Sequence, residues 1–389
     1  MTKKFIQIHA LTAYGANNLN RDELSRPKSE VFCGVPRLRL SSQCLKRAYR
    51  TSEVMADIMT GTRSRDLWFT LASEQVALGH PEAAVIAHIV PVRDAFEGSK
   101  SAAPKDEESG TDDADSETPP SEAKKGKGGK KKKGAAPLPA TLAELKGNLF
   151  YASKSEVEFI KTVLADSLNP SGSTKGAPIE QKVVEGQILD LLMSVDVAMF
   201  GRMVAGNKPL SVEGGVQAAH AFTVHKATAD DDFFTAVDDI SPDEGSGHMG
   251  SNGFGAGVYY SYFNVDVDVL LKNLNGDKAL AARAIEAFIE AVATVAPGGK
   301  QNTFAARSYA FYLAVEVGNA QPRSYADAFA APVKGDDITG GAVAALRANR
   351  EAAFQCFPSQ RTEYREMFVA ARQGSLPEVQ ALVAEAVAA

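Results

Sequence analysis

Residues 35–50 read VPRLRLSSQCLKRAYR, and this stretch predicts a short strand that turns directly into a helix. Arg37 and Arg39 alternate with two leucines, so the arginines share one face of the strand. Ser41 and Ser42 suit the start of a helix, where a side-chain oxygen accepts a hydrogen bond from a free backbone amide. The stretch therefore predicts one strand-helix unit from which the rest of the fold can be worked out.

The helix of this unit carries a polar, mostly cationic stripe. Its members recur at intervals of three and four residues and so share one helical face: Gln43, Lys46, Arg47 and Arg50. Cations beside a capped helix start suit phosphate groups. A lone basic helix face is more often just solvated, but here the cations continue through Arg39 and, in the preceding loop, Arg21 and Lys28. With Ser41, this track predicts contacts to a nucleic-acid backbone.

The net charge is unevenly distributed along the chain. The 389 residues carry a formal net charge of −6, but residues 1–50 hold ten basic and three acidic side chains and therefore carry +7. The remainder carries −13. An acidic protein with one basic end binds polyanions along a defined track rather than over its whole surface.

The composition indicates a cytoplasmic protein with a sizeable core. Of its residues, 44% are hydrophobic, enough for two or three subdomains. The three cysteines show neither zinc nor disulfide spacing, which favours a reducing compartment. The apolar run at the amino end is too short for a signal peptide, and no stretch has the length of a membrane helix, so we expect no membrane partner.

Hydrophobic periodicity predicts strands separated by helices. Strands are expected at residues 5–11, 35–40, 258–271 and 311–317, and helices at 42–50, 62–88, 155–167, 180–200 and 277–294 and from 340 to the end. This pattern favours an α+β fold with a small antiparallel sheet of the ferredoxin or RNA-recognition-motif type, carrying large insertions. Residues 97–140 hold an acidic block and then a lysine block, nine charges of each sign, and predict a disordered, self-neutralising insert. Its lysine run is alternatively a loose nucleic-acid contact.

Three further groups are candidates for nucleic-acid contact. Phe233 and Phe234, followed by Thr235, lie in a polar, glycine-rich loop and either stack on bases or anchor the loop to the core. Met203 lies in a glycine-flanked turn, where methionine ordinarily fills a core gap. Lys300, Gln301 and Asn302 follow two glycines and weakly suggest backbone contact with phosphate. 

The sequence gives little indication of catalysis. The chain has no phosphate-binding loop, no nucleophile elbow and no dinucleotide fingerprint, and its six histidines form no metal pair at helical spacing. We therefore expect no catalytic residue, no metal and no cofactor. One alternative is a metal-dependent RNA-cleaving subunit that uses Asp22, although a loop aspartate is more often a turn cap. Another is a soluble protein whose basic helix binds a protein partner.

Several motifs, in order along the chain, carry a resemblance to a known family. They include FIQIHAL, LNRDELSRPK, RLRLSSQCLKRAYR, FGRMV, DDFFTAVDD, GSGHMGSNGFGAGVYYSYFNVD and APGGKQNTFAA. Together they resemble the backbone subunit of the type I-E CRISPR Cascade complex, the CasC family. The similarity covers most of the chain to about residue 310 on both sides of the insert.

The resemblance implies a palm, helical fingers and a β-hairpin thumb. The palm is an antiparallel α+β domain like an RNA-recognition motif. It would comprise residues 1–60 and 216–335, with the thumb within about 227–257. Residues 61–215 would form the helical fingers, which contain the charged insert, and residues 336–389 would form C-terminal helices.

The resemblance also implies a non-catalytic role in antiviral defence. Copies of the subunit stack along one guide CRISPR RNA beside other Cascade subunits, displace bases at intervals, and allow the guide to pair with a target DNA strand. By motif, the guide contacts are Arg21, Lys28, Ser41, Gln43, Lys46, Arg47 and Arg50. Met203 would abut the displaced nucleotide, and Phe233, Phe234 and Thr235 would form the thumb tip. Members of the family often have tryptophan at the position of Phe233, so this chain keeps the stacking face but loses the indole donor.

Overall fold

The computed structural model describes residues 4–98, 139–146, 149–168, 184, 193–237, 246–360 and 362–388. Nearly all of the predicted charged insert at 97–140 lies outside the described residues, as does most of the amino-terminal part of the helix predicted at 180–200. The chain forms two compact units. Unit 1 comprises Met1–Met59, Ala198–Phe200 and Gly214–Ala389, and unit 2 comprises Thr60–Val197 and Gly201–Glu213.

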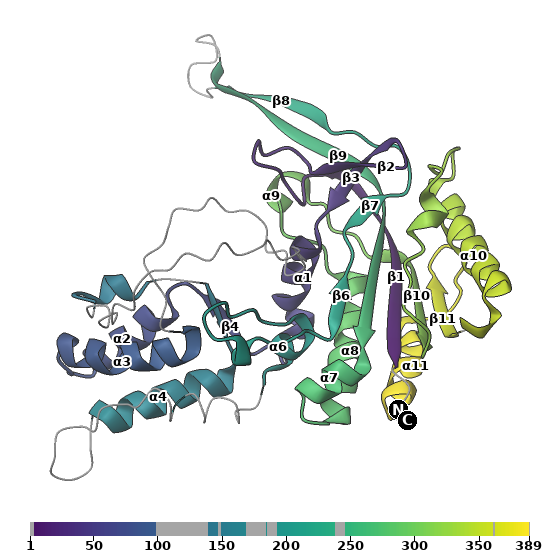
Figure 1. Ribbon diagram of the computed structural model, residues 1–389. Helices are drawn as coiled ribbons and strands as arrows, with labels where there is room; N and C mark the ends of the chain where they lie inside the picture. Colours follow the sequence, from purple (N-terminus) through teal and green to yellow (C-terminus); the bar gives the residue numbers. More distant parts are fainter. Residues whose placement is uncertain are drawn as a thin grey trace, which may run out of the picture. The chain divides into compact units, whose positions relative to one another are not determined.

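Unit 1 holds a large antiparallel sheet with helices packed against it (Figure 1). Its strands are β1 (Phe5–Asn17), β2 (Ser29–Phe32), β3 (Val35–Leu40), β6 (Val216–Ala218), β7 (Ala221–Thr223), β8 (Asp230–Val237), β9 (Ser246–Asp266), β10 (Ala310–Gly318) and β11 (Glu363–Phe368). Its helices are α1 (Ser42–Arg50), α7 (Val267–Asn273), α8 (Lys278–Thr294), α9 (Gln301–Phe304), α10 (Ile338–Cys356) and α11 (Leu376–Ala388). The short helix α6 (Val195–Phe200) spans the boundary between the units.

The sheet order is β11-β10-β1-β9-β7-β3-β2, and β6 and β8 also pair with β9. Strand β1 lies between β10 and β9, and His9 faces Ala314 on one side and Tyr262 on the other. With nine strands among the described residues, the sheet is larger than the small sheet that the sequence predicts. The prediction of a mixed α+β fold with an antiparallel sheet is confirmed.

Helices cover both faces of the central strands, which explains why β1 is buried almost throughout. On one face, the Phe263 ring lies edge-on to Phe288 of α8 and to Tyr49 of α1, at centroid distances of 5.5 and 5.7 Å. On the other face, Leu11 and Tyr260 belong to a cluster closed by residues of α10. The predicted strand-helix unit therefore supplies one wall of the core, because Leu45 and Tyr49 are buried while the charged side chains of α1 remain at the surface.

Unit 2 is mainly helical. It contains β4 (Thr62–Ser64), β5 (Phe150–Ala152), α2 (Leu67–Ala77), α3 (Glu82–Glu97) and α4 (Lys154–Leu168). The rings of Trp68, Phe96 and Phe150 meet in its core at centroid distances of 5.7 to 6.1 Å. The prediction of a single helix at residues 62–88 is wrong, because this region contains β4, α2 and the start of α3. Gly79 takes a φ of 99° and Pro81 precedes α3, so the chain turns between two helices.

Two predicted elements in unit 1 differ from the structure. The alternation NVDVDV predicts a strand through residue 271, but the strand ends at Asp266, whose carboxylate accepts a hydrogen bond from Val269 N at 3.0 Å and caps α7. The sequence also predicts only helices after residue 340, whereas β11 lies between α10 and α11 and pairs with β10. The first difference depends on a capping side chain and the second on a partner strand that is distant in the chain. Both override the preference of the local hydrophobic pattern.

Candidate nucleic-acid interface

Helix α1 presents the predicted polar stripe beside a capped amino end. Ser41 is the capping residue, and its Oγ accepts a hydrogen bond from Cys44 N at 3.3 Å. Arg47 is exposed, whereas Gln43, Lys46 and Arg50 are partly buried. Arg47 and Arg50 also lie in the last turn, where positive charge interacts favourably with the helix dipole. The stripe therefore combines a hydrogen-bonding helix start with cations along one face.

The loop before β2 is tied to the start of α1. Asn20 Oδ1 accepts a hydrogen bond from Ser41 N at 2.8 Å, and Asn20 O accepts one from Lys28 N at 2.9 Å. Asn18 Nδ2 donates to Ser25 O and to Gly253 O of β9, at 2.9 and 2.8 Å. Arg21 is exposed in this loop and Lys28 is partly exposed at its end. The structure thus brings the predicted loop cations into the same unit and the same hydrogen-bonded framework as α1.

Asp22 serves as the internal cap of this loop. Its Oδ1 accepts hydrogen bonds from the backbone amides of Leu24 and Arg26, at 3.0 and 2.8 Å. Across the described stretches of the chain, no group of three or more histidine, cysteine, aspartate or glutamate side chains is arranged to hold a metal ion. The turn-cap role is the one for which the structure provides contacts.

The two arginines of β3 have different environments. Arg37 is fully buried, and its guanidinium donates to Thr223 O and Phe329 O, each at 2.8 Å. Burial lowers the pKa of Arg37 from its usual value. Arg39 is partly exposed, hydrogen-bonds to His220 and lies 3.8 Å from the Glu30 carboxylate. Arg37 is therefore part of the core, and Arg39 reaches the surface already paired with protein groups.

Phe233, Phe234 and Thr235 do not lie in a loop, contrary to the sequence prediction. They belong to β8, whose register pairs Phe233 with Ser251, Phe234 with Gly250 and Thr235 with Met249 of β9. We call residues 230–237 and 246–254 the β8–β9 arm, which Figure 1 shows extending from the sheet. The glycine-rich composition concealed this pairing, because glycine disfavours strands in isolation.

The aromatic side chains of the arm occupy opposite faces. Phe233 is 67% exposed and shares its face with Met249, which is 63% exposed. The ring of Phe234 covers Gly250 so closely that a Cβ atom there would lie 2.6 Å from Phe234 Cζ. One face of the arm therefore offers two large apolar side chains to solvent, suited to stacking on a flat ring. Sequence reasoning missed Met249, because its alignment with Phe233 depends on strand register.

The turn before α9 lies against the loop at residues 18–27. Gly299 approaches Leu19 so closely that a Cβ atom on it would meet Leu19 O at 2.4 Å. Lys300 donates to Asn252 Oδ1 of the arm at 3.3 Å, and Asn302 is exposed. Gln301 is occupied by bonds to Pro297 O and Ala306 O. Of these predicted residues, Lys300 reaches the arm, Asn302 is exposed in α9, and Gln301 holds the turn together.

A second link to the arm escaped sequence reasoning. Arg26 donates from Nη2 to both carboxylate oxygens of Asp231, at 2.9 and 3.1 Å. The two residues are 205 positions apart in the chain, so neither carries a local signal of the contact. This pair places β8 and the cationic loop side by side.

Met203 belongs to unit 2 and is 74% exposed, so it does not fill a core gap. Its neighbour Arg202 is buried, bonding to both Glu156 carboxylate oxygens at 2.7 and 2.8 Å and to Tyr151 O at 2.9 Å. A buried, paired arginine fixes the backbone on which Met203 points outward.

The sequence of this chain matches a known protein family, and its fold matches solved structures. A family model described as "CT1975-like protein" matches residues 6–387. The chain belongs to this family. It is similar to a chain of a solved "CRISPR RNA-guided surveillance complex, pre-nicking", with a TM-score of 0.73, 29% identity and coverage of 98% of this chain and 100% of that one. It is also similar to a chain of a "CRISPR RNA-guided surveillance complex", with a TM-score of 0.57, 25% identity and coverage of 98% and 99%.

No curated protein matches the sequence. The predicted similarity to subunits of CRISPR RNA-guided complexes is confirmed by the family and by both structures. The type I-E assignment stays a prediction. Within the part of the chain that the structure describes, no helix has both the length and the apolar character needed to cross a membrane.

Proposed function

We propose that this protein is a backbone subunit of a Cascade-type CRISPR RNA-guided surveillance complex, and that several copies bind one guide RNA. The observation that carries the proposal is the convergence, within unit 1, of the α1 stripe, the loop at 18–28, the turn at Lys300 and the β8–β9 arm. Family membership and the two similar complexes support the same assignment.

The roles of the individual residues follow from their chemistry. Arg21, Lys28, Lys46, Arg47 and Arg50 would neutralise phosphates, while Gln43, the Ser41 cap, Lys300 and Asn302 would fix register along the backbone. Arg39 would contribute charge near the start of α1 while it holds Glu30 and His220. Contacts to the backbone do not depend on the identity of the bases. The guide itself would therefore specify the target by base pairing.

The arm would act on the bases. An extended antiparallel pair with exposed Phe233 can insert between bases and displace one from the stack, with Thr235 beside it and Phe234 bracing the strand. Met203 of unit 2 would contact the displaced nucleotide. Arms repeated along a filament of copies would displace bases at regular intervals and leave the remaining bases free to pair with target DNA.

The finer palm assignment is also part of the proposal. Strands β10, β1, β9 and β6 lie in an order typical of a ferredoxin-like sheet, with α1 following β1 in the chain and α8 connecting β9 to β10. This order supports an RNA-recognition-motif-like palm, with the helical unit 2 as the fingers. We further propose that the subunit holds nucleic acid without cutting it, in the cytoplasm, and as part of the type I-E class.

The test removes three cations of α1 together, in K46A/R47A/R50A. We expect guide affinity to fall by about tenfold or more, and the slope of log affinity against log salt to fall by about 2, since each single-strand phosphate contact contributes about 0.7. Fluorescence anisotropy across a salt series measures both quantities.

The matched control is K272A/R283A/R365A, which removes the same charge from exposed positions outside α1. It should retain both affinity and slope, so equal losses in the two variants, or unchanged binding in the first, would contradict the proposal. Incubation with complementary RNA and magnesium adds a second readout. Periodic cleavage that disappears in Asp22→Ala would instead establish the RNA-cleaving alternative.

A further inference from the structure

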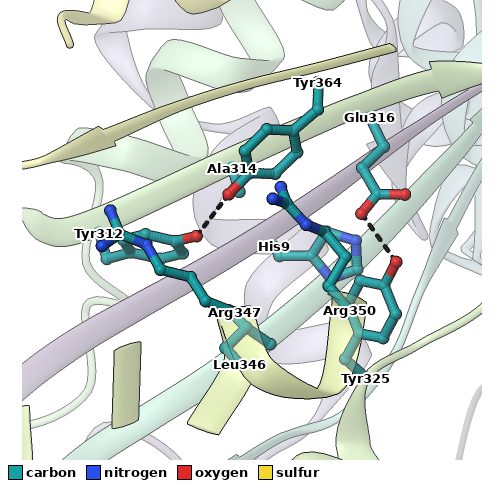
Figure 2. A pocket seen from close by; sticks show the side chains of 9 residues that line it. All are labelled: His9, Tyr312, Ala314, Glu316, Tyr325, Leu346, Arg347, Arg350 and Tyr364. Carbon is teal, nitrogen blue, oxygen red and sulfur yellow. Dashed lines mark hydrogen bonds between the residues drawn. The ribbon is translucent and has the colours of Figure 1, made fainter. Parts of the chain in front are cut away.

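A small cavity lies in unit 1, on the face of the sheet that α10 covers. It is bounded by β1, β10, β11 and α10, and its lining includes His9, Glu316, Tyr325, Arg350 and Tyr364 (Figure 2). The space left for the centre of a water-sized sphere is about 10 Å³. That is room for one water molecule or one monatomic ion. Nothing in the proposed RNA-binding function uses this cavity.

The cavity has buried hydrogen-bond donors that lack acceptors. His9 is 1% exposed, and its Nε2 has no hydrogen-bond partner among the described residues. Arg350 Nε and Nη1 are likewise buried without a partner there. Figure 2 shows His9 and Arg350 approaching the same space from β1 and α10. Leaving such groups unsatisfied is costly, so the site is built for something that accepts hydrogen bonds.

The oxygen atoms around the cavity already have donors. Glu316 Oε1 accepts from the Tyr325 hydroxyl and Oε2 from Thr362 Oγ1, both at 2.8 Å. The Tyr364 hydroxyl donates to Glu366 Oε2, and the Tyr312 hydroxyl lies within hydrogen-bond distance of both Glu366 Oε2 and Tyr364 Oη. Every unpartnered buried polar atom among the lining residues is therefore a nitrogen. A water molecule would bring two hydrogens to a site that already has donors in excess.

A donor at His9 Nε2 requires one tautomer of the ring. Tyr260 Oη accepts from Tyr325 N at 3.0 Å and lies 2.9 Å from His9 Nδ1, and we place the Tyr260 hydrogen on the bond to Nδ1. Its other hydroxyl neighbour, Ser324 Oγ, is farther away at 3.5 Å. In the neutral ring, Nε2 then carries the hydrogen and donates toward the cavity.

Three arginines and two carboxylates lie near the cavity, which leaves an excess of one positive charge. Burial, together with the positive charges of Arg350 and Arg323, lowers the pKa of His9 to about 3. Of the two carboxylates nearby, Glu366 is paired with Arg347 at 2.7 Å, and Glu316 receives two hydroxyl hydrogens. Arg350 stacks on Tyr364, with Cζ 3.2 Å from the ring centroid.

We propose that this cavity is a binding site for a monatomic anion, chloride under cellular conditions, held by His9 Nε2 and the Arg350 guanidinium. The ion would link α10 to β1 by accepting hydrogen bonds from the donors that have no acceptor in the protein. The site is independent of the RNA track, so its test and the test of the proposed function can fail separately.

Bromide replacement locates the ion directly. Crystals of the full-length protein grown or soaked in sodium bromide should give an anomalous peak within about 3.5 Å of His9 Nε2 and Arg350 Nη1. This measurement uses the unaltered chain, so it decides the matter even if variants fold poorly. An ordinary water peak without anomalous signal at that position would overturn the proposal.

Thermal unfolding provides the second test. At equal ionic strength, the unaltered protein should melt about 2 °C higher in sodium chloride than in sodium gluconate, because a ligand that binds only the native state stabilises it. Arg350→Met should abolish the difference, and Arg365→Met, at an exposed arginine of β11, should retain it. Equal melting temperatures of the unaltered protein in the two salts would contradict a chloride site.

Discussion

Arg37 and Arg39 are two positions apart on β3, yet only one of them reaches solvent. Arg37 is fully buried, and the backbone oxygen of Phe329, 292 residues later in the chain, accepts a hydrogen bond from its guanidinium. An arginine that donates to backbone carbonyls in a core stabilises the fold, since removing it leaves those acceptors unsatisfied.

We therefore expect Arg37→Met to lower the free energy of unfolding by about 2–4 kcal/mol. Arg47→Met, at an exposed position on α1, should change stability by no more than about 0.5 kcal/mol while weakening RNA binding. Urea unfolding and anisotropy measure the two effects. Comparable destabilisation by both changes would show that Arg37 is not a core residue in solution.

His9 provides a pH dependence with a definite sign. Its folded-state pKa, about 3, is below the usual 6.5, so the unfolded chain binds the proton more readily. The stabilising contribution is complete above pH 6.5 and is lost as the pH falls toward 3.

In chloride-free buffer, where no anion offsets the charge on the ring, His9 should account for about 2.5 kcal/mol of lost stability between pH 7 and pH 4.5. His9→Gln removes the titrating group and should flatten the curve over that range. Urea unfolding at several pH values compares the two slopes, and an unchanged slope in the variant would mean that other groups cause the acid sensitivity.

At the scale of elements, the contact between the loop and the arm is electrostatic and exposed. The Arg26 and Asp231 side chains are 49% and 56% exposed, so solvent screens much of their attraction. Arg26 makes both of its hydrogen bonds through Nη2, which is weaker than a two-nitrogen clamp.

A double-mutant cycle with Arg26→Met and Asp231→Asn should give a coupling energy of about 0.2–1 kcal/mol that decreases with added salt. Unfolding measured at low and high ionic strength provides the values. A coupling above about 2 kcal/mol, insensitive to salt, would indicate that the pair is buried in solution.

Local sequence patterns correctly predicted the helices and strands whose signals lie within a few neighbouring residues. The β3–α1 unit, the alanine-rich helix α8 and the strand β10 follow from alternation, helical period and capping. The pairing of β8 with glycine-rich β9, the edge strand β11 and the enclosure of Arg37 depend on partners far along the chain. The site was predicted as a track of cations and polar side chains with separate aromatic and methionine candidates, but the asparagines that join its parts, Asn18 and Asn20, have no local signature.

At the scale of the whole molecule, an acidic chain concentrates positive charge at its amino end, where the proposed RNA track lies. Residues 1–50 carry +7 against −6 for the entire chain. Association of the protein with guide RNA should therefore be fast at low salt and slower at higher ionic strength. At 0.1 M salt, screening weakens the attraction between charges that are more than about 10 Å apart.

If copies line up on one guide, the number bound should increase stepwise with RNA length. Native mass spectrometry of the protein with guides of increasing length should show added masses of one 41.3 kDa subunit at regular length intervals. The K46A/R47A/R50A variant should show fewer copies on each guide. A constant single copy on every guide would contradict a backbone role.

Strand β9 runs for 21 residues without interruption from the arm into the centre of the sheet. Because side chains alternate along a strand, adding one residue to each strand of the arm would turn every outer side chain to the opposite face. Adding two to each would lengthen the arm and leave its faces as they are. Arm length in related or engineered chains should therefore change in even steps, so that the reach of the arm can vary while the side that carries Phe233 stays constant.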